Sequence, residues 1–539
     1  MQIPEHQAGD FCFFEPGVAR QFNGYNQHCG IEKRHSEDRY DECGIHREMV
    51  SDYLLEGCAM SGVSIRFGTD GWRAVMCDTF TFANVSLVCQ ALAQHILEAG
   101  RAAQGVIVAY DARFLGEQFA LQAAEVLLGN GIPVWLPQTD VPTPVVAHAV
   151  VTIGAAGAVM FTASHNPPEY NGIKFIPHYG GPATPEITTS IEQHLSAVMH
   201  SAQSVKQRTP AQAGSECRAL DPRPAYVEHI RGLVDLPAVR AAGITIGYDA
   251  MHGSGRNYVA PILADAGIPV VAIRCTRDPL FGGSAPEPKA DHLAGLMELV
   301  RGGHAQLGLA TDGDADRFGI IDSDGAYLTP NEVISLLIPY LVTERGMRGA
   351  VVRTVATTHL IDRLAAHFQL AVYETPVGFK HICDRMRQEP VVIGGEESGG
   401  LSIGSHIPEK DGILAGLLVA EVAAKTGLPL GSMLRQWSAK VGPAQTRRID
   451  IVIPEEAKSA LLANLCQQPP AKVGEQRVQR VLTIDGAKYL LEDGSWLLVR
   501  ASGTEPVVRI YLEAPDALAL QNLEHNARTL VEEVTGYAH

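Results

Sequence analysis

The stretch with the clearest potential for chemistry brings a serine, a histidine and a lysine close together in the chain. Ser164 and His165 follow an apolar run, Ala158 to Phe161, of the kind that forms a buried strand. Two prolines come next, so we expect Ser164 on a tight, exposed loop at the end of that strand. His165 can carry a proton near neutral pH, and Lys174 can return a positive charge to the same place. This combination suits phosphoryl chemistry; the alternative is a loop serine that only caps a turn.

A second cluster consists of Asp312, Asp314 and Asp316, which follow another apolar run. We expect these aspartates to alternate along a short extended segment, which would place all three on one face. Three like charges held together repel one another unless a cation compensates them, and hard oxygen ligands suit Mg²⁺. An EF-hand does not fit, because its sixth position is Arg317 where a glycine is needed. The alternative is a solvated acidic turn.

Two further loops carry groups suited to binding sugars and phosphates. Glu396 and Ser398 stand between glycines, so a hydroxyl-rich ligand could approach the backbone closely, although such a segment could also be only a turn. Near the C-terminus, two guanidinium groups, two hydroxyls and backbone N–H groups form a set that suits a phosphate dianion. Its members are Arg500, Ser502, Gly503, Thr504 and Arg509. The alternative there is a surface turn with two exposed arginines.

A repeated order of strands and helices must position these loops. A strand ending in Tyr-Asp, a helical stretch and a Gly-Ile-Pro-Val segment occur twice, beginning at Val106 and at Ile244. A weaker third copy begins at Ala350. Strand and helix alternate in all three, which predicts βαβ units with mostly parallel sheets. Because ligands bind beyond the carboxyl ends of parallel strands, three equivalent loops can converge on one cleft.

The two ends of the chain differ from this pattern. After about Val441, four strand-like runs precede a helix from Asp516 to about Val534, which predicts a smaller α+β domain. Residues 1–62 contain four cysteines whose spacings match no zinc pattern, and they show little periodicity. We expect a poorly ordered extension there, and Met60 offers an alternative translation start.

Composition narrows the class of protein. The 539 residues are 46% hydrophobic and carry a formal net charge of −17, which argues against a nucleic-acid or anionic-membrane surface. No run approaches the ~18 apolar residues of a membrane span, and the N-terminus lacks a signal-peptide pattern. The 10 cysteines are scattered, as in proteins with reduced thiols. We therefore expect a cytoplasmic protein.

Six motifs after residue 62 give the chain a specific resemblance. They read FGTDGWR, TASHNPPEYNGIKF, TDGDADRFG, TPVGFKHI, GGEESGG and RASGTEPVVR. In this set and order the chain resembles the α-D-phosphohexomutases, the phosphoglucomutase/phosphomannomutase superfamily, with motifs nearest to phosphoglucomutases. The resemblance implies three tandem mixed α/β domains and a smaller C-terminal α+β domain around a central cleft. The expected ranges are 1–62 for the extension and 63–205, 206–322, 323–441 and 442–539 for the four domains.

The resemblance also implies roles for individual residues. It makes Ser164 a phosphoserine and makes Ser164, Asp312, Asp314 and Asp316 the ligands of one Mg²⁺ ion. It gives the charge-stabilising and proton-transfer roles to Arg73, His165 and Lys174, with the general base left open among them. Substrate binding falls to Arg317, Gly378, Lys380, Glu396, Ser398, Arg500, Ser502, Gly503, Thr504 and Arg509.

The implied reaction interconverts glucose 1-phosphate and glucose 6-phosphate through a phosphoserine and a sugar bisphosphate, which also serves as activator. The fourth domain is expected to move between open and closed states so that the intermediate can turn over. The partners would be small sugar phosphates, without nucleic acid or membrane, and the protein a monomer or homodimer. The alternatives are a phosphomannomutase or dual-specificity mutase, a Mg²⁺-dependent sugar-phosphate phosphatase and a non-catalytic sugar-phosphate sensor.

Overall fold

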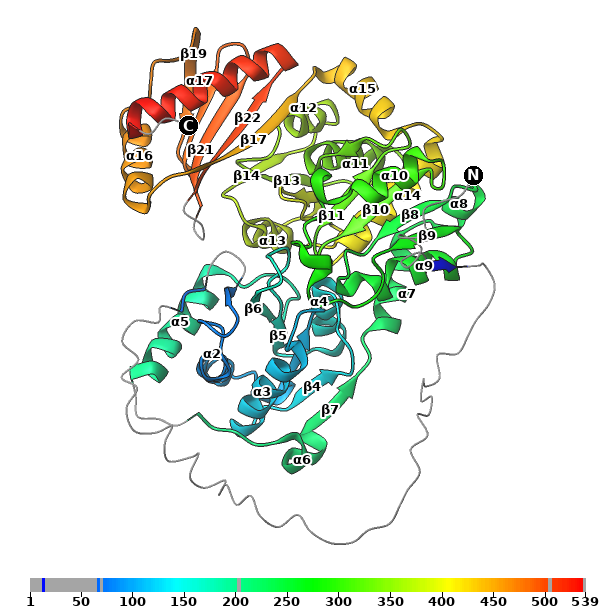
Figure 1. The fold of residues 1–539 in the computed structure, drawn as a ribbon, viewed down its shortest axis with the longest axis vertical. Helices are drawn as coiled ribbons and strands as arrows, with labels where there is room; N and C mark the ends of the chain where they lie inside the picture. The colour runs from blue at the N-terminus through cyan, green and yellow to red at the C-terminus, as the bar shows by residue number, and fades with distance from the viewer. Residues whose placement is uncertain (1–11, 15–64, 68–70, 201–204, 503–506, 537–539) are drawn as a thin grey trace. The chain divides into compact units, whose positions relative to one another are not determined.

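The first sheet has a parallel centre and two antiparallel strands at one edge (Figure 1). The structure is a computed structural model that describes residues 12–14, 65–67, 71–200, 205–502 and 507–536. The strand order is β2-β6-β5-β3-β4-β7. These strands are β2 (Trp72–Val75), β3 (Val106–Tyr110), β4 (Val134–Pro137), β5 (Gly157–Phe161), β6 (Tyr170–Pro177) and β7 (Cys217–Leu220). The helices between them are α2 (Phe82–Glu98), α3 (Gly116–Gly129), α4 (Thr143–Ile153) and α5 (Pro185–His200).

The second sheet repeats this plan in the order β1-β9-β8-β10-β11-β12. Its strands are β1 (Cys12–Phe14), β8 (Ile246–Asp249), β9 (Val270–Ile273), β10 (Leu307–Thr311), β11 (Phe318–Ile321) and β12 (Tyr327–Leu328). The helices are α7 (Arg223–Leu233), α8 (Leu236–Ala241), α9 (Val259–Asp265) and α10 (Ala294–Arg301). The strand β1 pairs antiparallel with β9, so a short part of the expected extension joins this sheet. The rest of residues 1–62 lies outside the described residues.

The third sheet has the order β14-β13-β15-β16, with β15 and β16 antiparallel. Its strands are β13 (Ala350–Thr354), β14 (Val372–Thr375), β15 (Val391–Gly395) and β16 (Leu401–Ile403). The helices are α11 (Pro330–Thr343), α12 (Leu360–His367), α13 (Phe379–Gln388), α14 (Gly412–Thr426) and α15 (Leu430–Val441). Among the described residues, no single helix is long and apolar enough to cross a membrane; α14 and α15 meet that test only as a pair bent by 81°.

The fourth sheet is antiparallel throughout, in the order β17-β22-β21-β20-β19-β18, and α17 lies across it (Figure 1). Its strands are β17 (Gln445–Val452), β18 (Lys472–Val473), β19 (Gln476–Leu482), β20 (Ala487–Leu491), β21 (Trp496–Ala501) and β22 (Val507–Ala514). Its helices are α16 (Glu455–Gln467) and α17 (Ala517–Thr535). Three tandem α/β domains and a C-terminal α+β domain were therefore correctly predicted. The sequence pattern had not revealed β18, β20 or α16.

Two strands extend past the domain ranges expected from the sequence. The strand β7 pairs in parallel with β4 of the first sheet, although residues 206–322 were assigned to the second domain. The strand β12 pairs with β11 of the second sheet, beyond residue 322. Hydrogen bonding to the sheet, which no local pattern reveals, decides where these short strands belong.

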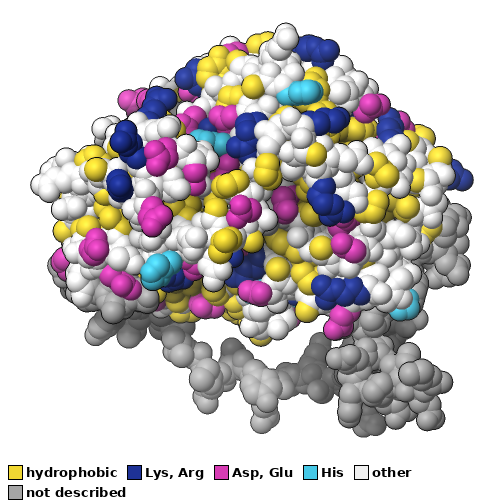
Figure 2. Space-filling view, turned by 90° about the horizontal axis from the view of Figure 1, so that it is seen from above, with side chains coloured by type: hydrophobic (Ala, Val, Ile, Leu, Met, Phe, Trp, Pro, Cys, Tyr) yellow, Lys and Arg dark blue, Asp and Glu magenta, His cyan; other side chains and the backbone are white. Residues whose placement is uncertain are grey.

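The apolar core of the fourth domain is separate from the core that runs through the other three domains. One cluster is continuous through the first three sheets and includes Ile107, Ile246 and Val351. The fourth sheet and its helices have a cluster of their own, which includes Leu497 and Leu512. On one face of the molecule, basic and acidic side chains are interspersed, with scattered hydrophobic side chains between them (Figure 2).

Candidate active site

Three hairpin loops occupy equivalent places in the first three sheets. In each sheet a central parallel strand is followed by an antiparallel neighbour: β5 by β6, β10 by β11 and β15 by β16. The loop between the two strands carries Ser164 in the first sheet, the three aspartates in the second, and Glu396 with Ser398 in the third. Equivalent connections in three related domains therefore deliver the candidate groups.

Ser164 lies on its predicted loop but is buried. Its side chain is 1% exposed, and its Oγ donates to Asp312 Oδ2 at 2.7 Å. The backbone adopts φ of 51°, and its N–H donates to Thr162 Oγ1 at 2.8 Å. The expectation of an exposed serine is therefore wrong, because the aspartate loop of the second domain covers it. The contact unites the first two candidate groups.

The three aspartates converge as predicted, although not for the predicted reason. One carboxylate oxygen from each of Asp312, Asp314 and Asp316 lies within 4.8 Å of the others, and all three residues are buried. The segment consists of turns and bends after β10 rather than an extended strand, and Ala315 adopts φ of 56°. Backbone reversal, not alternation along a strand, brings the carboxylates together.

Lys174 on β6 partly neutralises this acidic cluster. Its Nζ lies 2.9 Å from Asp314 Oδ2 and 2.8 Å from Asp316 Oδ2. Burial and then the neighbouring aspartates raise the pKa of Asp312 well above its ordinary value. Burial alone would also raise the pKa of Asp314, but the Lys174 ammonium holds it below 3.8.

The donor set of this cluster fits a hard divalent cation. Asp314 Oδ1 and Asp316 Oδ1 are buried and have no hydrogen-bond partner among the described residues. Buried carboxylate oxygens normally have partners, and three convergent carboxylates are the ligands that Mg²⁺ prefers. The residues present are therefore suitable for holding such an ion.

Three more predicted residues surround the serine loop. Arg73 on β2 donates from Nη1 to Asn166 Oδ1 at 2.8 Å, and the Arg317 N–H donates to Asp312 Oδ1 at 3.0 Å. Burial, followed by Arg317 and Arg73, holds the pKa of His165 well below 6.5. This shift opposes the expectation that His165 carries a proton near neutral pH: its imidazole stays neutral there and is a weak base.

The third loop borders the aspartate loop. A side chain at Gly399 would lie 3.7 Å from Arg317 Cβ, and Glu396 is 7% exposed. Burial raises the pKa of Glu396 above 4.5, and the Ser398 hydroxyl bonds to its carboxylate. Gly378 and Lys380 lie elsewhere in this domain, at the N-cap and in the first turn of α13.

The two predicted phosphate-binding arginines lie opposite each other on two neighbouring strands. Arg500 on β21 pairs directly with Arg509 on β22. Ser502 follows β21, and its carbonyl accepts from Lys458 Nζ at 2.8 Å. Gly503 and Thr504 lie outside the described residues. The fourth domain therefore carries two guanidinium groups on neighbouring strands of its sheet.

Three buried residues of this region were missed in the sequence. The Thr143 Oγ1 donates to Asp314 Oδ2 at 2.6 Å, and Lys410 Nζ lies 3.5 Å from Asp316 Oδ2. The Arg113 guanidinium donates to four backbone carbonyls of the serine loop, at distances of 2.6 to 2.9 Å. These carbonyls belong to Ser164, Asn166, Pro167 and Tyr170. The only signal was the Tyr-Asp strand ending just before Arg113.

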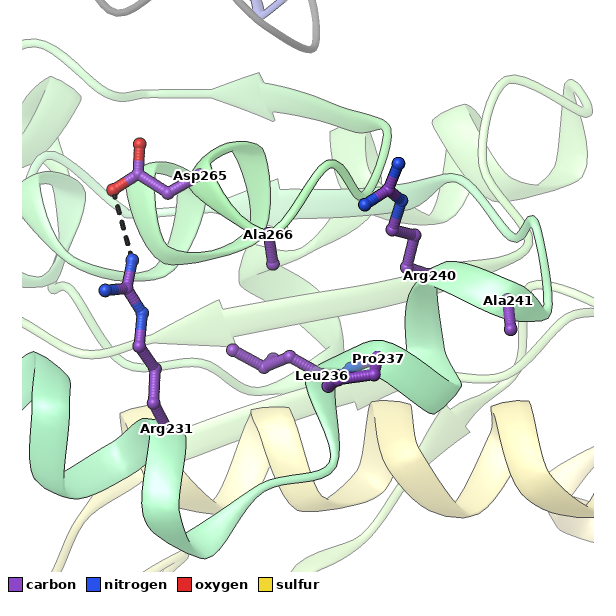
Figure 3. Close-up of a pocket in the computed structure, with 7 residues that line it drawn as sticks. All are labelled: Arg231, Leu236, Pro237, Arg240, Ala241, Asp265 and Ala266. Carbon is purple, nitrogen blue, oxygen red and sulfur yellow. Dashed lines mark ion pairs between the residues drawn. The ribbon is translucent and has the colours of Figure 1, made fainter.

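A separate surface pocket of about 750 Å³ lies on the second domain (Figure 3). It is lined by helices α7, α8 and α9, and Arg231 pairs there with Asp265 at 3.6 Å. Arg240 lies on its other side, and Leu236 and Pro237 contribute apolar surface. None of the sequence-predicted site residues lines this pocket, so it is distinct from the candidate site.

Fold and site together define a class: a multidomain α/β enzyme whose loops bring together a serine hydroxyl, several carboxylates and several lysine and arginine side chains. These are the groups that phosphoryl transfer requires. Four domain descriptions of phosphoglucomutase/phosphomannomutase match the chain: alpha/beta/alpha domain I over residues 64–201, domain II over 224–325, domain III over 329–440 and the C-terminal domain over 455–530. The chain belongs to the phosphoglucomutase/phosphomannomutase family, whose members are isomerases that transfer phosphate intramolecularly.

Individual relatives support the family and differ in their named substrates. The phosphoglucomutase/phosphomannomutase of Thermococcus kodakarensis is 30% identical over 472 residues, which cover 87% of this chain and 99% of that protein. A probable phosphoglucosamine mutase of Methanothermobacter thermautotrophicus is 31% identical, covering 87% and 98%. The open form of pp63/parafusin, a phosphoglucomutase from Paramecium, has a TM-score of 0.76 at 22% identity, covering 88% and 96%, which shows the shared fold.

Proposed function

We propose that this enzyme interconverts glucose 1-phosphate and glucose 6-phosphate through a phosphorylated Ser164 and a bound glucose bisphosphate. The observation that carries the proposal is the 2.7 Å hydrogen bond from Ser164 Oγ to Asp312, which joins the serine to the acidic cluster. Covalent storage on serine divides one isomerisation into two in-line transfers. The serine first donates its phosphoryl group to the free hydroxyl of the sugar monophosphate and then takes back the other phosphate.

In this mechanism Asp312, Asp314 and Asp316, together with phosphorylated Ser164, would hold one Mg²⁺ ion. Such an ion would supply charge compensation for the transferring phosphoryl group. Lys174 and Arg317 lie against the aspartates and add positive charge, while Arg73 fixes Asn166 beside the serine. The lowered pKa of His165 makes it a weak acceptor for the proton of the attacking hydroxyl, so the general base stays open among His165, Arg73 and Lys174.

The remaining residues are proposed to hold the sugar and its second phosphate. Glu396 and Ser398, with Gly378 and Lys380, would bind the sugar hydroxyls. The non-reacting phosphate would be held by Arg500, Ser502, Gly503, Thr504 and Arg509. The proposal includes a cytoplasmic enzyme that is a monomer or homodimer, with sugar phosphates as its partners and a sugar bisphosphate as activator.

Glucose is favoured over mannose and glucosamine on the sequence of one segment. Residues 374–381 read ETPVGFKH, which is closer to phosphoglucomutases than to the branch acting on glucosamine phosphate. A dual-specificity phosphoglucomutase/phosphomannomutase is the second candidate, because the Thermococcus relative carries both names.

A coupled assay tests the substrate. We expect glucose 1-phosphate, primed with glucose bisphosphate, to give a higher kcat/KM than mannose 1-phosphate or glucosamine 1-phosphate with their own bisphosphates. A higher value for either other sugar would contradict the glucose assignment. Stoichiometric release of free phosphate would instead indicate a phosphatase.

Intact-mass measurement and one variant test the nucleophile. Ser164→Ala should abolish phosphorylation of the protein and lower turnover by about 10³-fold or more. Ser196→Ala, on the exposed side of α5, is the matched control and should keep full activity. Full mutase activity in Ser164→Ala would exclude the proposed mechanism.

A further inference from the structure

A carboxylate in the fourth domain joins the candidate phosphate site to the third domain. Asp485 lies in the turn between β19 and β20, and its Oδ2 accepts from Arg500 Nε at 2.8 Å. The same oxygen accepts from the backbone N–H of Val377 at 3.0 Å. One atom therefore links the β21 arginine to the segment that leads directly into Gly378 and α13.

Close packing of the turn brings this carboxylate to Arg500. Gly486 adopts φ of 99°, a conformation that side-chain-bearing residues rarely adopt. A Cβ at this position would lie 2.4 Å from the Val499 carbonyl oxygen and 3.2 Å from Arg500 Cα. The turn therefore lies directly against the backbone of β21, which only glycine permits.

The strand that follows the turn is anchored in the third domain. Lys488, on β20, is fully buried, and its Nζ donates to the Val355 carbonyl at 2.7 Å and to Glu374 Oε1 at 3.1 Å. Residues 485–488 thus contact the third domain at two places while one of them holds Arg500.

We propose that Asp485 is a positioning residue that aims Arg500 at the non-reacting phosphate and aligns it with the sugar-binding segment of the third domain. The bond uses the single Nε–H, and the other four guanidinium donors are on the terminal nitrogens, where they suit a phosphate. The side chains of Asp485 and Arg500 are 25% and 14% exposed, so water competes only partly for their bond. The inference rests on the proposed role of Arg500.

The test compares KM with kcat for both glucose monophosphates. We expect Asp485→Ala to raise KM by about tenfold while kcat changes by less than about twofold, because binding shared by ground state and transition state is lost. In an Arg500→Ala background, the same change should raise KM by less than about twofold, because Asp485 acts through that arginine. Asp493→Ala is the matched control, since Asp493 bonds only to Ser495 within the next turn among the contacts described.

The outcomes separate this inference from the proposed function. If Arg500→Ala raises KM but Asp485→Ala behaves like Asp493→Ala, the positioning role is overturned and the phosphate role of Arg500 stands. If Arg500→Ala leaves KM unchanged, the proposed phosphate site itself fails. A purely structural role would lower kcat without changing KM, and that result also overturns the inference. Should the alanine variant not fold, Asp485→Asn keeps an acceptor oxygen; we expect a rise of about threefold in KM, and no rise would overturn the inference.

Discussion

Arg113 shows how a single side chain can stabilise a loop that has no regular hydrogen bonding. The serine loop includes a left-handed residue, Ser164, and two consecutive prolines, so it cannot form a continuous ladder with neighbouring strands. Arg113 is completely buried and supplies donors to four of its carbonyls, and its charge is balanced by Asp111 at 3.4 Å. A planar group with five donors is suited to this arrangement.

Replacing Arg113 by lysine tests this role. An ammonium presents its donors from one point and cannot reach four separated carbonyls, so buried acceptors lose their partners. We expect Arg113→Lys to lower the free energy of unfolding by about 3 kcal/mol and turnover by about tenfold or more. Urea unfolding and the mutase assay measure the two effects.

Arg101→Lys is the control for that change. Arg101 lies in the same domain and donates to Gln104 at 3.2 Å at the surface, so its substitution should alter neither quantity measurably. Equal effects of the two changes would contradict the role given to Arg113.

The sequence predicted site residues where a local pattern accompanied them. Ser164 and the aspartates follow short apolar runs and end in Gly- or Pro-containing loops, and so they were found. Arg113 and Thr143 act on residues more than 50 positions away, and no periodicity connects such positions. Burial of Ser164 and the neutral state of His165 depend on packing between domains, which one-dimensional patterns do not contain.

At the scale of elements, α4 connects the acidic cluster with a histidine cluster at the junction of three domains. Its first residue, Thr143, bonds to Asp314 through both its hydroxyl and its backbone N–H. Further along the helix, the ring of His148 lies 4.7 Å from that of His229 on α7. His229 bonds to His406 at 2.9 Å, and His406 bonds to Asp411, the N-cap of α14. Protonation of His148 would therefore affect α4, the same helix whose first residue bonds to the aspartate loop.

The histidine cluster predicts acid sensitivity. Burial and then the nearby His229 and His406 lower the pKa of His148 from 6.5 to about 4, while nearby Asp411 opposes the shift. The unfolded chain therefore binds more protons between these values, and stability present above pH 6.5 is lost as the pH falls toward 4. We expect His148→Gln to show a smaller loss across this window, by about 2 kcal/mol, in unfolding measured at pH 7 and pH 4.5.

His304→Gln is the matched control for the acid prediction. His304 is exposed on the second domain, so its substitution should reproduce the pH dependence of the unchanged protein. If His148→Gln also reproduces it, the cluster does not determine the acid response.

At the scale of the whole molecule, specific polar contacts and a small apolar cluster attach the fourth domain to the third. Its own apolar core is separate from the continuous core of the first three domains. The contact with the third domain combines a small apolar cluster, which includes Val355 and Trp496, with the buried Lys488. An attachment of this kind is consistent with a domain that changes position, which the mechanism requires but which remains a prediction.

Lys488 gives this attachment a measurable dependence on pH. Burial, followed by Arg353, lowers the pKa of Lys488 from 10.5 to about 8, although Glu374 and Asp362 oppose the shift. Between these values the unfolded chain binds the extra proton, so stability rises as the pH increases from 8 to 10.5. Lys488→Met should remove about 2 kcal/mol of that rise, measured as the difference between melting curves at pH 8 and pH 10.

Lys472→Met provides the comparison for this change. Lys472 is exposed on β18 in the same domain, so its substitution should leave the alkaline rise intact. An unchanged rise in Lys488→Met would show that this lysine is charged equally in the folded and unfolded states.

The burial of Ser164, at 1% exposure, has a further consequence for the resting enzyme. In the proposed mechanism, a phosphoryl group on Ser164 would be shielded from bulk water and from the active sites of other enzymes, because neither would reach the phosphorus atom without local opening. A phosphorylated enzyme molecule would therefore keep its phosphoryl group between encounters with sugar. The lifetime of that phosphoserine would report how often the surrounding loops separate.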